Sequence, residues 1–237
     1  MKKTIFLLMA VSLSFFMLTS CSKDDDDNGT GKNTHYLKCP DSHHPHAIDL
    51  GLPSGTKWAC CNVDATTPEG YGGYYAWGET SEKSYYDWGT YKWCNGSYDN
   101  FTKYCTDPKC GNVDGKTVLD LSDDVAHVRM GGSWRMPNIE QMNELIDNCT
   151  RTWTSQNGVN GILVTGKNGG QIFLPAAGYR FYDGLDDAGL YGYYWSSSLS
   201  QYFDDGAYGL GFYYRSWGGW FNDFHRYVGH SVRAVCQ

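Results

Sequence analysis

Glycine recurs along the whole chain, 29 times in 237 residues, and leaves few uninterrupted stretches in which a helix could form. Each glycine inside a helix costs about 1 kcal/mol relative to alanine, and clustered glycines mark turns. One stretch, Asn138–Cys149, predicts a helix clearly, because Asn138 can cap it, Gln141 follows at the capping-box position and apolar residues recur at helical spacing. A second, weaker helix is predicted over Asp123–Arg129.

Strand patterns are short and more frequent than helical ones. Ile172–Leu174 is an apolar run of strand type. Two later segments alternate apolar residues at a period of two: Leu210, Phe212 and Tyr214, and then Val232, Ala234 and Cys236. We therefore predict an α+β fold with short strands, one or two main helices and long ordered loops.

The first 20 residues differ in composition from the rest of the chain. Lys2 and Lys3 precede an apolar run, Ile5–Met17, which is typical of a signal peptide and falls short of the roughly 20 residues that a membrane-spanning helix needs. The segment Leu18–Cys21 (Leu-Thr-Ser-Cys) resembles a bacterial lipobox, which implies that residues 1–20 are removed and that Cys21 carries a lipid. The acidic run Asp24–Asp27 resembles the surface-export signal of Bacteroidetes lipoproteins. We expect a lipid-anchored, surface-exposed protein of the outer membrane; a secreted soluble protein and an uncleaved anchor are the alternatives.

Two further parts follow the leader. Residues 21–34 hold no large apolar side chain and are typical of an acidic, polar tether, whereas residues 35–237 suffice for one domain. The leader contains two of the 19 basic residues and none of the 26 acidic ones, so the mature chain carries a net charge of −9. That balance argues against nucleic acid and anionic membrane surfaces as partners, because no basic patch is available to collect phosphates.

Eight cysteines remain besides Cys21, and an even number in an exported chain favours disulfides. Cys94 and Cys105 could form a local bridge, and Cys61 is the favoured distant partner of Cys236. The adjacent Cys60 and Cys61 cannot readily bond to each other. No pair of cysteines recurs at the spacing of a structural zinc site, so none is predicted.

Six sequence blocks follow one another from about residue 46 to the end of the chain: His46–Val63, Tyr74–Thr80, Gly131–Pro137, Phe173–Arg180, Tyr193–Ser198 and Gly229–Arg233. Together they resemble the Fibrobacter succinogenes major paralogous domain of Bacteroidetes lipoproteins. The resemblance implies a C-type-lectin-like fold related to that of formylglycine-generating enzymes. Asp64 and Asn138 depart from the family's usual glycine and threonine or serine. Aspartate tolerates a turn and asparagine caps a helix well, so both changes are compatible with the pattern.

Aromatic residues gather in one C-terminal segment. Residues 179–228 contain 18 of the 38 phenylalanines, tyrosines and tryptophans, mixed with glycine, serine and aspartate. Large stiff rings beside small polar residues are typical of binding surfaces, and ring faces flanked by carboxylates suit sugars. The competing explanation is a core rich in aromatic residues, which we expect to include Trp58, Trp77, Trp134, Tyr194, Trp195, Leu210 and Phe212.

The aromatic and acidic residues in irregular runs are predicted to bind an extracellular glycan or protein. They are Tyr182, Asp183, Asp186, Asp187, Tyr202, Phe203, Asp204, Asp205, Trp217, Trp220, Phe221, Asn222, Asp223 and Phe224. The resemblance also suggests a diversified receptor face in this last third of the chain. The alternatives are a structural or adhesin-tip protein, and an enzyme related to formylglycine-generating enzymes.

No cofactor is predicted, although calcium and transition metals deserve comparison. Calcium needs six to eight oxygen ligands, which Asp183, Asp186, Asp187, Asp204 and Asp205 could supply in part. We interpret these acids as solvated surface residues. His43, His44 and His46 could hold a transition metal, but their place beside the tether and the intervening Pro45 favour an incidental cluster. The sequence contains no hydrolase, metalloprotease or phosphate-loop motif, so we expect a protein without catalytic activity.

Overall fold

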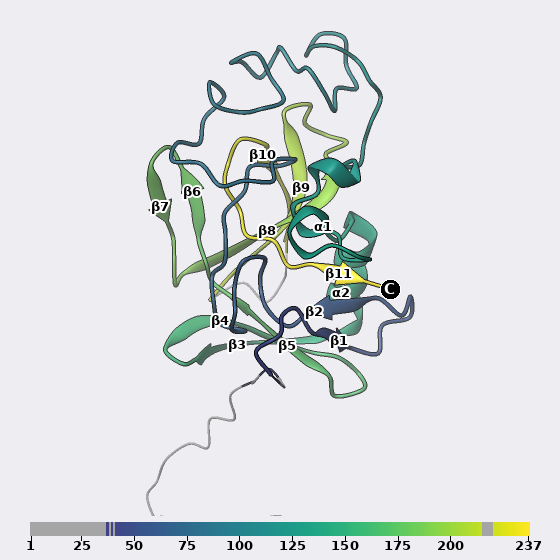
Figure 1. Cartoon of the computed structure of the whole chain (residues 1–237), viewed down its shortest axis with the longest axis vertical. Coiled ribbons are helices and arrows are strands. Elements are labelled where there is room, and N and C mark those ends of the chain that lie inside the picture. The colour runs from purple at the N-terminus through teal and green to yellow at the C-terminus, as the bar shows by residue number, and fades with distance from the viewer. Residues whose placement is uncertain (1–36, 38, 40, 215–219) are drawn as a thin grey trace, which may run out of the picture. The chain divides into compact units, whose positions relative to one another are not determined.

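The computed structural model describes residues 37, 39, 41–214 and 220–237, and it is built mainly from β-strands (Figure 1). Of the described residues, 34% lie in strands and 10% in helices. The strands form four small antiparallel sheets, accompanied by two α-helices and one short 3-10 helix. This arrangement contradicts the predicted α+β fold and, with it, the C-type-lectin-like domain that the sequence blocks implied.

One sheet joins the beginning of the domain to its end. Its strands are β1 (Ala47–Asp49), β2 (Lys57–Ala59) and β11 (Val235–Cys236), in the order β1-β2-β11. Ala47 lies opposite Ala59, and Val235 lies opposite Trp58. The sheet therefore fixes the residues just before β1 and just after β2 next to each other.

A second sheet follows the main helix. Its strands are β3 (Thr150–Gln156), β4 (Val159–Thr165) and β5 (Gln171–Pro175). Helix α2 (Ile139–Asn148) packs its apolar side, including Met142 and Leu145, into the same core as strands of this sheet. The predicted capping box is confirmed: the Asn138 side chain accepts from the backbone N–H of Gln141, and the Gln141 side chain accepts from that of Asn138.

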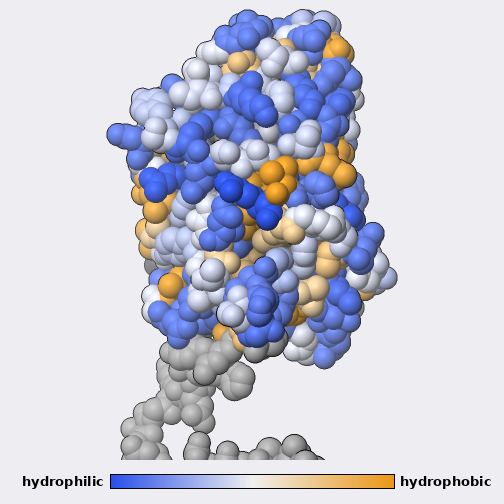
Figure 2. Space-filling view, in the orientation of Figure 1, coloured by the Kyte–Doolittle hydropathy of each residue, from blue (hydrophilic) through white to orange (hydrophobic). Residues whose placement is uncertain are grey.

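The second predicted helix is also present, two residues later at its start. The 3-10 helix η1 (Leu121–Asp123) leads into α1 (Val125–Met130), which the side chain of Asp124 caps by accepting from the backbone N–H of His127. Within the described residues, no helix has the length and apolar character needed to cross a membrane. The face shown in Figure 2 is largely hydrophilic, with apolar residues in small separate patches.

The aromatic C-terminal segment forms the remaining two sheets. A hairpin pairs β6 (Tyr179–Phe181) with β7 (Gly184–Asp186), on the left of Figure 1. A three-stranded meander then runs through β8 (Tyr191–Leu199), β9 (Gly206–Tyr213) and β10 (Trp220–His225), with β9 in the centre. The strands in this segment are longer than its glycine content predicts.

In this meander, glycines inside strands leave space for aromatic rings, and this explains why the sequence analysis predicted too little strand. A Cβ on Gly192 would overlap the ring of Phe212, and one on Gly209 would lie 2.8 Å from the carbonyl oxygen of Tyr194 and 3.0 Å from the ring of Phe224. These glycines lie inside strands and leave room for aromatic side chains from the neighbouring strand. The glycine content of this segment predicted turns and short strands, so its strand content was underestimated.

The predicted core residues are largely confirmed. Six of them are buried: Trp58, Trp77, Tyr194, Trp195, Leu210 and Phe212. Trp134 is half-buried, and Tyr214 is exposed beyond the end of β9. Arg233 is fully buried and donates to the Asn62 side chain and to the carbonyls of Ala59 and Phe173, so it connects the sheet at the chain ends to β5.

Candidate functional site

Two small cavities adjoin the end of β10, where it pairs with the start of β9. Asp223, Phe224 and His225 line both of them and lie opposite Tyr208, Ala207 and Gly206. The first cavity has a volume of about 220 Å³, and its other lining residues are Tyr179, Tyr193, Val228 and His230. The second has a volume of about 190 Å³ and adds Phe203, Asp205 and Gly206. We call the first the aromatic cavity.

Rings that contact one another build the walls of the aromatic cavity. Tyr193 stacks on His230 with 5.3 Å between ring centroids, and Phe224 meets both rings edge-on at 5.4 and 4.7 Å. Tyr179 packs edge-on against Tyr193 at 5.3 Å. Behind this layer the buried Trp195 stacks on His230 at 4.2 Å. Such interlocked rings have little rotational freedom, so the cavity is stiff before any ligand binds.

Two polar atoms among the lining residues are buried without a hydrogen-bond partner in the described part of the chain. They are Oδ1 of Asp223 and Nδ1 of His230. An unpaired buried polar atom costs roughly 1–3 kcal/mol. Burial lowers the pKa of His230 to about 3, so its imidazole is neutral at physiological pH and can either donate or accept one hydrogen bond at Nδ1.

An ion pair lies at the border between the two cavities. His225 Nδ1 is 3.0 Å from Asp205 Oδ2. The hydrogen bond that His225 donates to this carboxylate raises the pKa of His225 and lowers the pKa of Asp205. The adjacent Arg226 is fully buried, with its guanidinium 3.7 Å from the ring centroid of Phe101, and donates to the carbonyls of Tyr104 and Asp204. Arg226 therefore holds the Asp204–Asp205 turn against the end of β10.

The structure brings four of the predicted binding residues to the cavities: Phe203, Asp205, Asp223 and Phe224. Tyr202 is 80% exposed beside them, and the backbone of Asp204 is fixed by Arg226. Trp220, Phe221 and Asn222 belong to β10 and lie opposite Gly211, Leu210 and Gly209. Trp217 lies outside the described residues.

The other predicted binding residues lie on the β6–β7 hairpin and just after it. Tyr182 and Asp183 form its turn, Asp186 ends β7, and Asp187 follows. The backbone of Tyr182 pairs with that of Tyr86, and its ring packs at 4.2 Å from the ring of Phe181. None of these four residues lines either cavity.

Sequence reasoning missed Tyr179, Tyr193, His225, Val228 and His230 as lining residues. Tyr193 could have been found, because Tyr191 and Tyr193 share one face of a strand and stack with nearly parallel rings. His230 carries no comparable signal, since its place depends on the backbone pairing of Tyr75 with His230, which are distant in sequence.

The acids weighed as possible calcium ligands are not brought together in the described residues, and the expected disulfides are not formed there. Asp183, Asp186, Asp187, Asp204 and Asp205 do not come together as a group of three or more metal-binding side chains there. Eight cysteines are present as unbonded thiols: Cys39, Cys60, Cys61, Cys94, Cys105, Cys110, Cys149 and Cys236. The favoured bridges, Cys94 to Cys105 and Cys61 to Cys236, are therefore absent from the structure.

Comparisons with known proteins leave the site to be interpreted from its own geometry. No family model, no curated protein and no solved structure matches the chain.

Proposed function

We propose that this protein is a lipid-anchored surface protein that binds an extracellular glycan through the aromatic cavity. One observation carries the proposal: the unpaired Asp223 Oδ1 and His230 Nδ1 belong to residues that line a cavity walled by aromatic rings. Sugars offer C–H faces that pack on rings and hydroxyl groups that pair with such atoms. The anchor rests on the lipobox-like Leu18–Cys21 and the acidic run after it.

The size of the cavity narrows the ligand class. At about 220 Å³ it is smaller than the roughly 300–1,000 Å³ of pockets that take drug-sized molecules. It suits one sugar ring, with the neighbouring cavity at Phe203 and Asp205 available to the next ring of a chain. We therefore expect recognition of a terminal sugar and its neighbour. No bond is made or broken in this proposal.

The test is calorimetric titration of the mature chain, carrying Cys21→Ser to avoid lipidation, with ligands selected on a glycan array. Asp223→Asn keeps the shape of the side chain and removes its charge, and we expect it to weaken binding about tenfold or more. Asp186→Asn is the matched control, because Asp186 is exposed on the hairpin and lines neither cavity.

Equal affinity of Asp223→Asn and the parent protein would contradict the proposed site. Binding of proteins rather than glycans, or self-association without any glycan binding, would favour the protein-ligand or structural role. Both variants must show the melting temperature of the parent protein for the comparison to count.

A further inference from the structure

A second cluster of reactive side chains lies far from the aromatic cavity in sequence, at the beginning of the domain. Cys39, His44, His46 and Cys60 each offer one ligand atom, and these four atoms all lie within 4.8 Å of one another. We propose that the four side chains form a structural zinc site. The proposal is independent of glycan binding and concerns how residues 39–46 are held to the domain.

The distances match the coordination geometry of zinc. His44 Nδ1 lies 3.4 Å and His46 Nδ1 lies 3.5 Å from Cys60 Sγ. In a tetrahedral site with Zn–S near 2.3 Å and Zn–N near 2.05 Å, a sulfur and a nitrogen ligand are about 3.6 Å apart. Two thiolates and two imidazoles are also a donor set that zinc prefers, whereas calcium and magnesium take oxygen ligands.

The β1–β2 pairing places two of the ligands. Ala47 lies opposite Ala59, so the next residues outward, His46 and Cys60, also face each other. The backbone N–H of Cys60 donates to the carbonyl of His46 at 2.9 Å, and the backbone N–H of His46 donates to Cys60 Sγ at 3.2 Å. The sheet therefore orients the sulfur of Cys60 before a metal binds.

Asp41 orients one imidazole from the outside. Its Oδ1 is 3.1 Å from His46 Nε2, on the ring edge away from Cys60. A carboxylate there accepts the Nε2 proton, so that the lone pair of Nδ1 faces the sulfur. This carboxylate–histidine arrangement is the usual support of a metal-bound histidine. Cys61 Sγ also lies 3.6 Å from Cys60 Sγ and 3.7 Å from His44 Nδ1. Its thiol donates to the carbonyl of Ala65 at 3.1 Å, and we therefore place it outside the four ligands.

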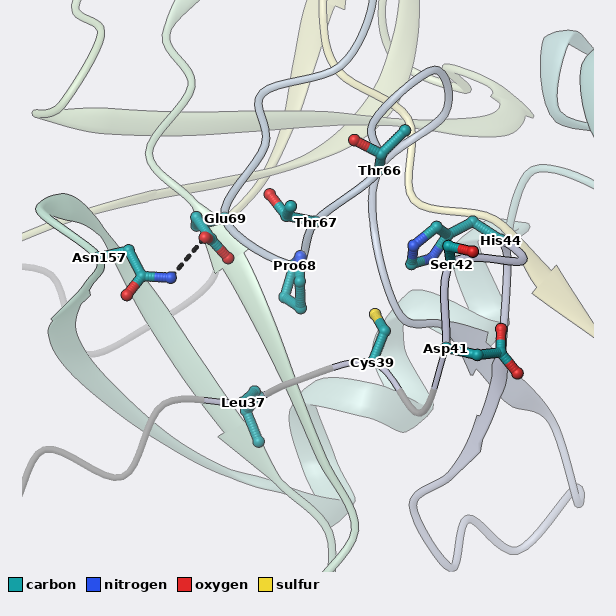
Figure 3. A pocket seen from close by; sticks show the side chains of 10 residues that line it. All are labelled: Leu37, Cys39, Asp41, Ser42, His44, Thr66, Thr67, Pro68, Glu69 and Asn157. Carbon is teal, nitrogen blue, oxygen red and sulfur yellow. Dashed lines mark hydrogen bonds between the residues drawn. The ribbon is translucent and has the colours of Figure 1, made fainter.

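Two members of the cluster, Cys39 and His44, line a cavity of about 530 Å³ (Figure 3). The sulfur of Cys39 and the imidazole of His44 lie on one side of it, whereas Glu69 and Asn157, joined by a hydrogen bond of 2.6 Å, lie on the other. Four protein ligands fill a tetrahedral zinc ion and leave no open position for substrate. The role that follows is mechanical: the metal would join the segment from Cys39 to His46 to the end of β2.

The competing arrangement of the same sulfurs is a disulfide between Cys39 and Cys60. A disulfide would give no role to the two imidazoles, which both direct Nδ1 at Cys60, or to the carboxylate behind His46. A metal uses all of these groups. The histidines were predicted to be an incidental cluster because they lie beside the tether and Pro45 intervenes. No zinc site was predicted because the cysteines lack regular spacing, and the β1–β2 register supplies the proximity of His46 and Cys60 that spacing does not show.

The test uses the mature chain with Cys21→Ser, purified without reductant or chelator and measured for zinc by mass spectrometry. We expect one zinc per chain. Replacement by Co²⁺ should give the sulfur-to-cobalt charge-transfer absorption and the intense visible bands of a tetrahedral site. His44→Asn and Cys60→Ser should each weaken zinc binding at least a hundredfold, and Asp41→Asn about 10–100-fold.

Matched controls are available in the chain. His43→Asn changes an exposed neighbouring histidine, and Cys110→Ser changes a half-buried cysteine outside the cluster; both should retain one zinc. The proposal is overturned if the protein holds no zinc and cobalt shows no sulfur charge transfer. It is also overturned if peptide mapping finds Cys39 bonded to Cys60 or Cys61. If Cys60→Ser fails to fold, the Asp41→Asn and His44→Asn affinities decide.

Discussion

At the scale of single residues, His230 is buried and one of its nitrogens has no hydrogen-bond partner among the residues that the structure describes. Its side chain is 1% exposed and lies between Trp195, Tyr193 and Phe224. The surrounding rings offer no solvation to an imidazolium, and burial lowers its pKa from 6.5 to about 3. The imidazole of His230 in the wall of the cavity is therefore neutral in the folded protein at physiological pH.

This pKa predicts how acid acts on stability. Between about pH 6.5 and pH 3 the unfolded chain binds a proton at His230 that the folded chain does not, so stability falls as the pH is lowered through this window. The penalty reaches roughly 3 kcal/mol at pH 4, at 1.36 kcal/mol for each pH unit below 6.5. We expect His230→Asn to lose this component, as measured by urea unfolding from pH 4 to pH 8.

His225→Asn is the control, because its contribution has the opposite sign. The pKa of His225 is raised and that of Asp205 is lowered, so their pair stabilises the protein between about pH 3.8 and 6.5 and weakens as the pH rises through the folded pKa of His225. The half-exposed pair is worth about 0.2–1 kcal/mol. If the free energy of unfolding depends on pH in the same way for the parent protein and for His230→Asn, then His230 takes up no additional proton on unfolding, and the prediction is wrong.

At the scale of secondary-structure elements, local signals were predictable and cross-strand packing was not. Helix α2 depends on Asn138, Gln141 and a stripe of apolar residues within one segment, and the sequence predicted all three. Strands β8–β10 depend on glycines whose space is filled by rings from the next strand. A single sequence does not reveal which ring faces which glycine. Only the alternation of Leu210, Phe212 and Tyr214 predicted a strand in this region, so the strand content was underestimated and the predicted fold class was wrong.

The same limit applies to the candidate sites. Composition located the C-terminal segment and four of the cavity residues, since aromatic and acidic residues are concentrated there. It could not find Tyr179 or His230, which reach the cavity through sheet pairing. The cluster of Cys39, His44, His46 and Cys60 was missed for the same reason. The register of β1 and β2 brings His46 next to Cys60, and their spacing in the sequence does not show this.

Alanine scanning of the strand glycines tests this account of β8 and β9. Gly192→Ala would force its methyl group into the ring of Phe212, and we expect a loss of about 1–3 kcal/mol in the free energy of unfolding. Gly211→Ala is the matched control, because its Cβ would lie 3.4 Å from Phe224, which is ordinary contact. It should be neutral or stabilising by less than about 1 kcal/mol. Equal losses at both positions would mean that the glycines serve backbone freedom instead of ring packing.

At the scale of the whole molecule, the two ends of the domain are joined. Strand β11 near the C-terminus pairs with β2, and the buried Arg233 donates to groups on Asn62, Ala59 and Phe173. The proposed zinc site would add the segment that leads into β1. The first part of the domain is thereby held by sheet pairing, by a buried guanidinium and by a metal.

The last prediction concerns the proposed lipid anchor at Cys21. Cys21 should incorporate an alkyne-labelled fatty acid when the full chain is expressed in a Bacteroidetes host, because Leu18–Cys21 resembles a lipobox. Two or three acyl chains bind a membrane stably, at about 0.8 kcal/mol for each buried methylene. Cys21→Ala should lose the label and leave the membrane fraction.

Replacing Asp24–Asp27 by four alanines should keep the label but protect the domain from protease added to intact cells, because the acidic run would direct export rather than lipidation. A labelled protein that remains accessible without the acidic run would contradict that division of roles, and an unlabelled Cys21 would remove the anchor itself.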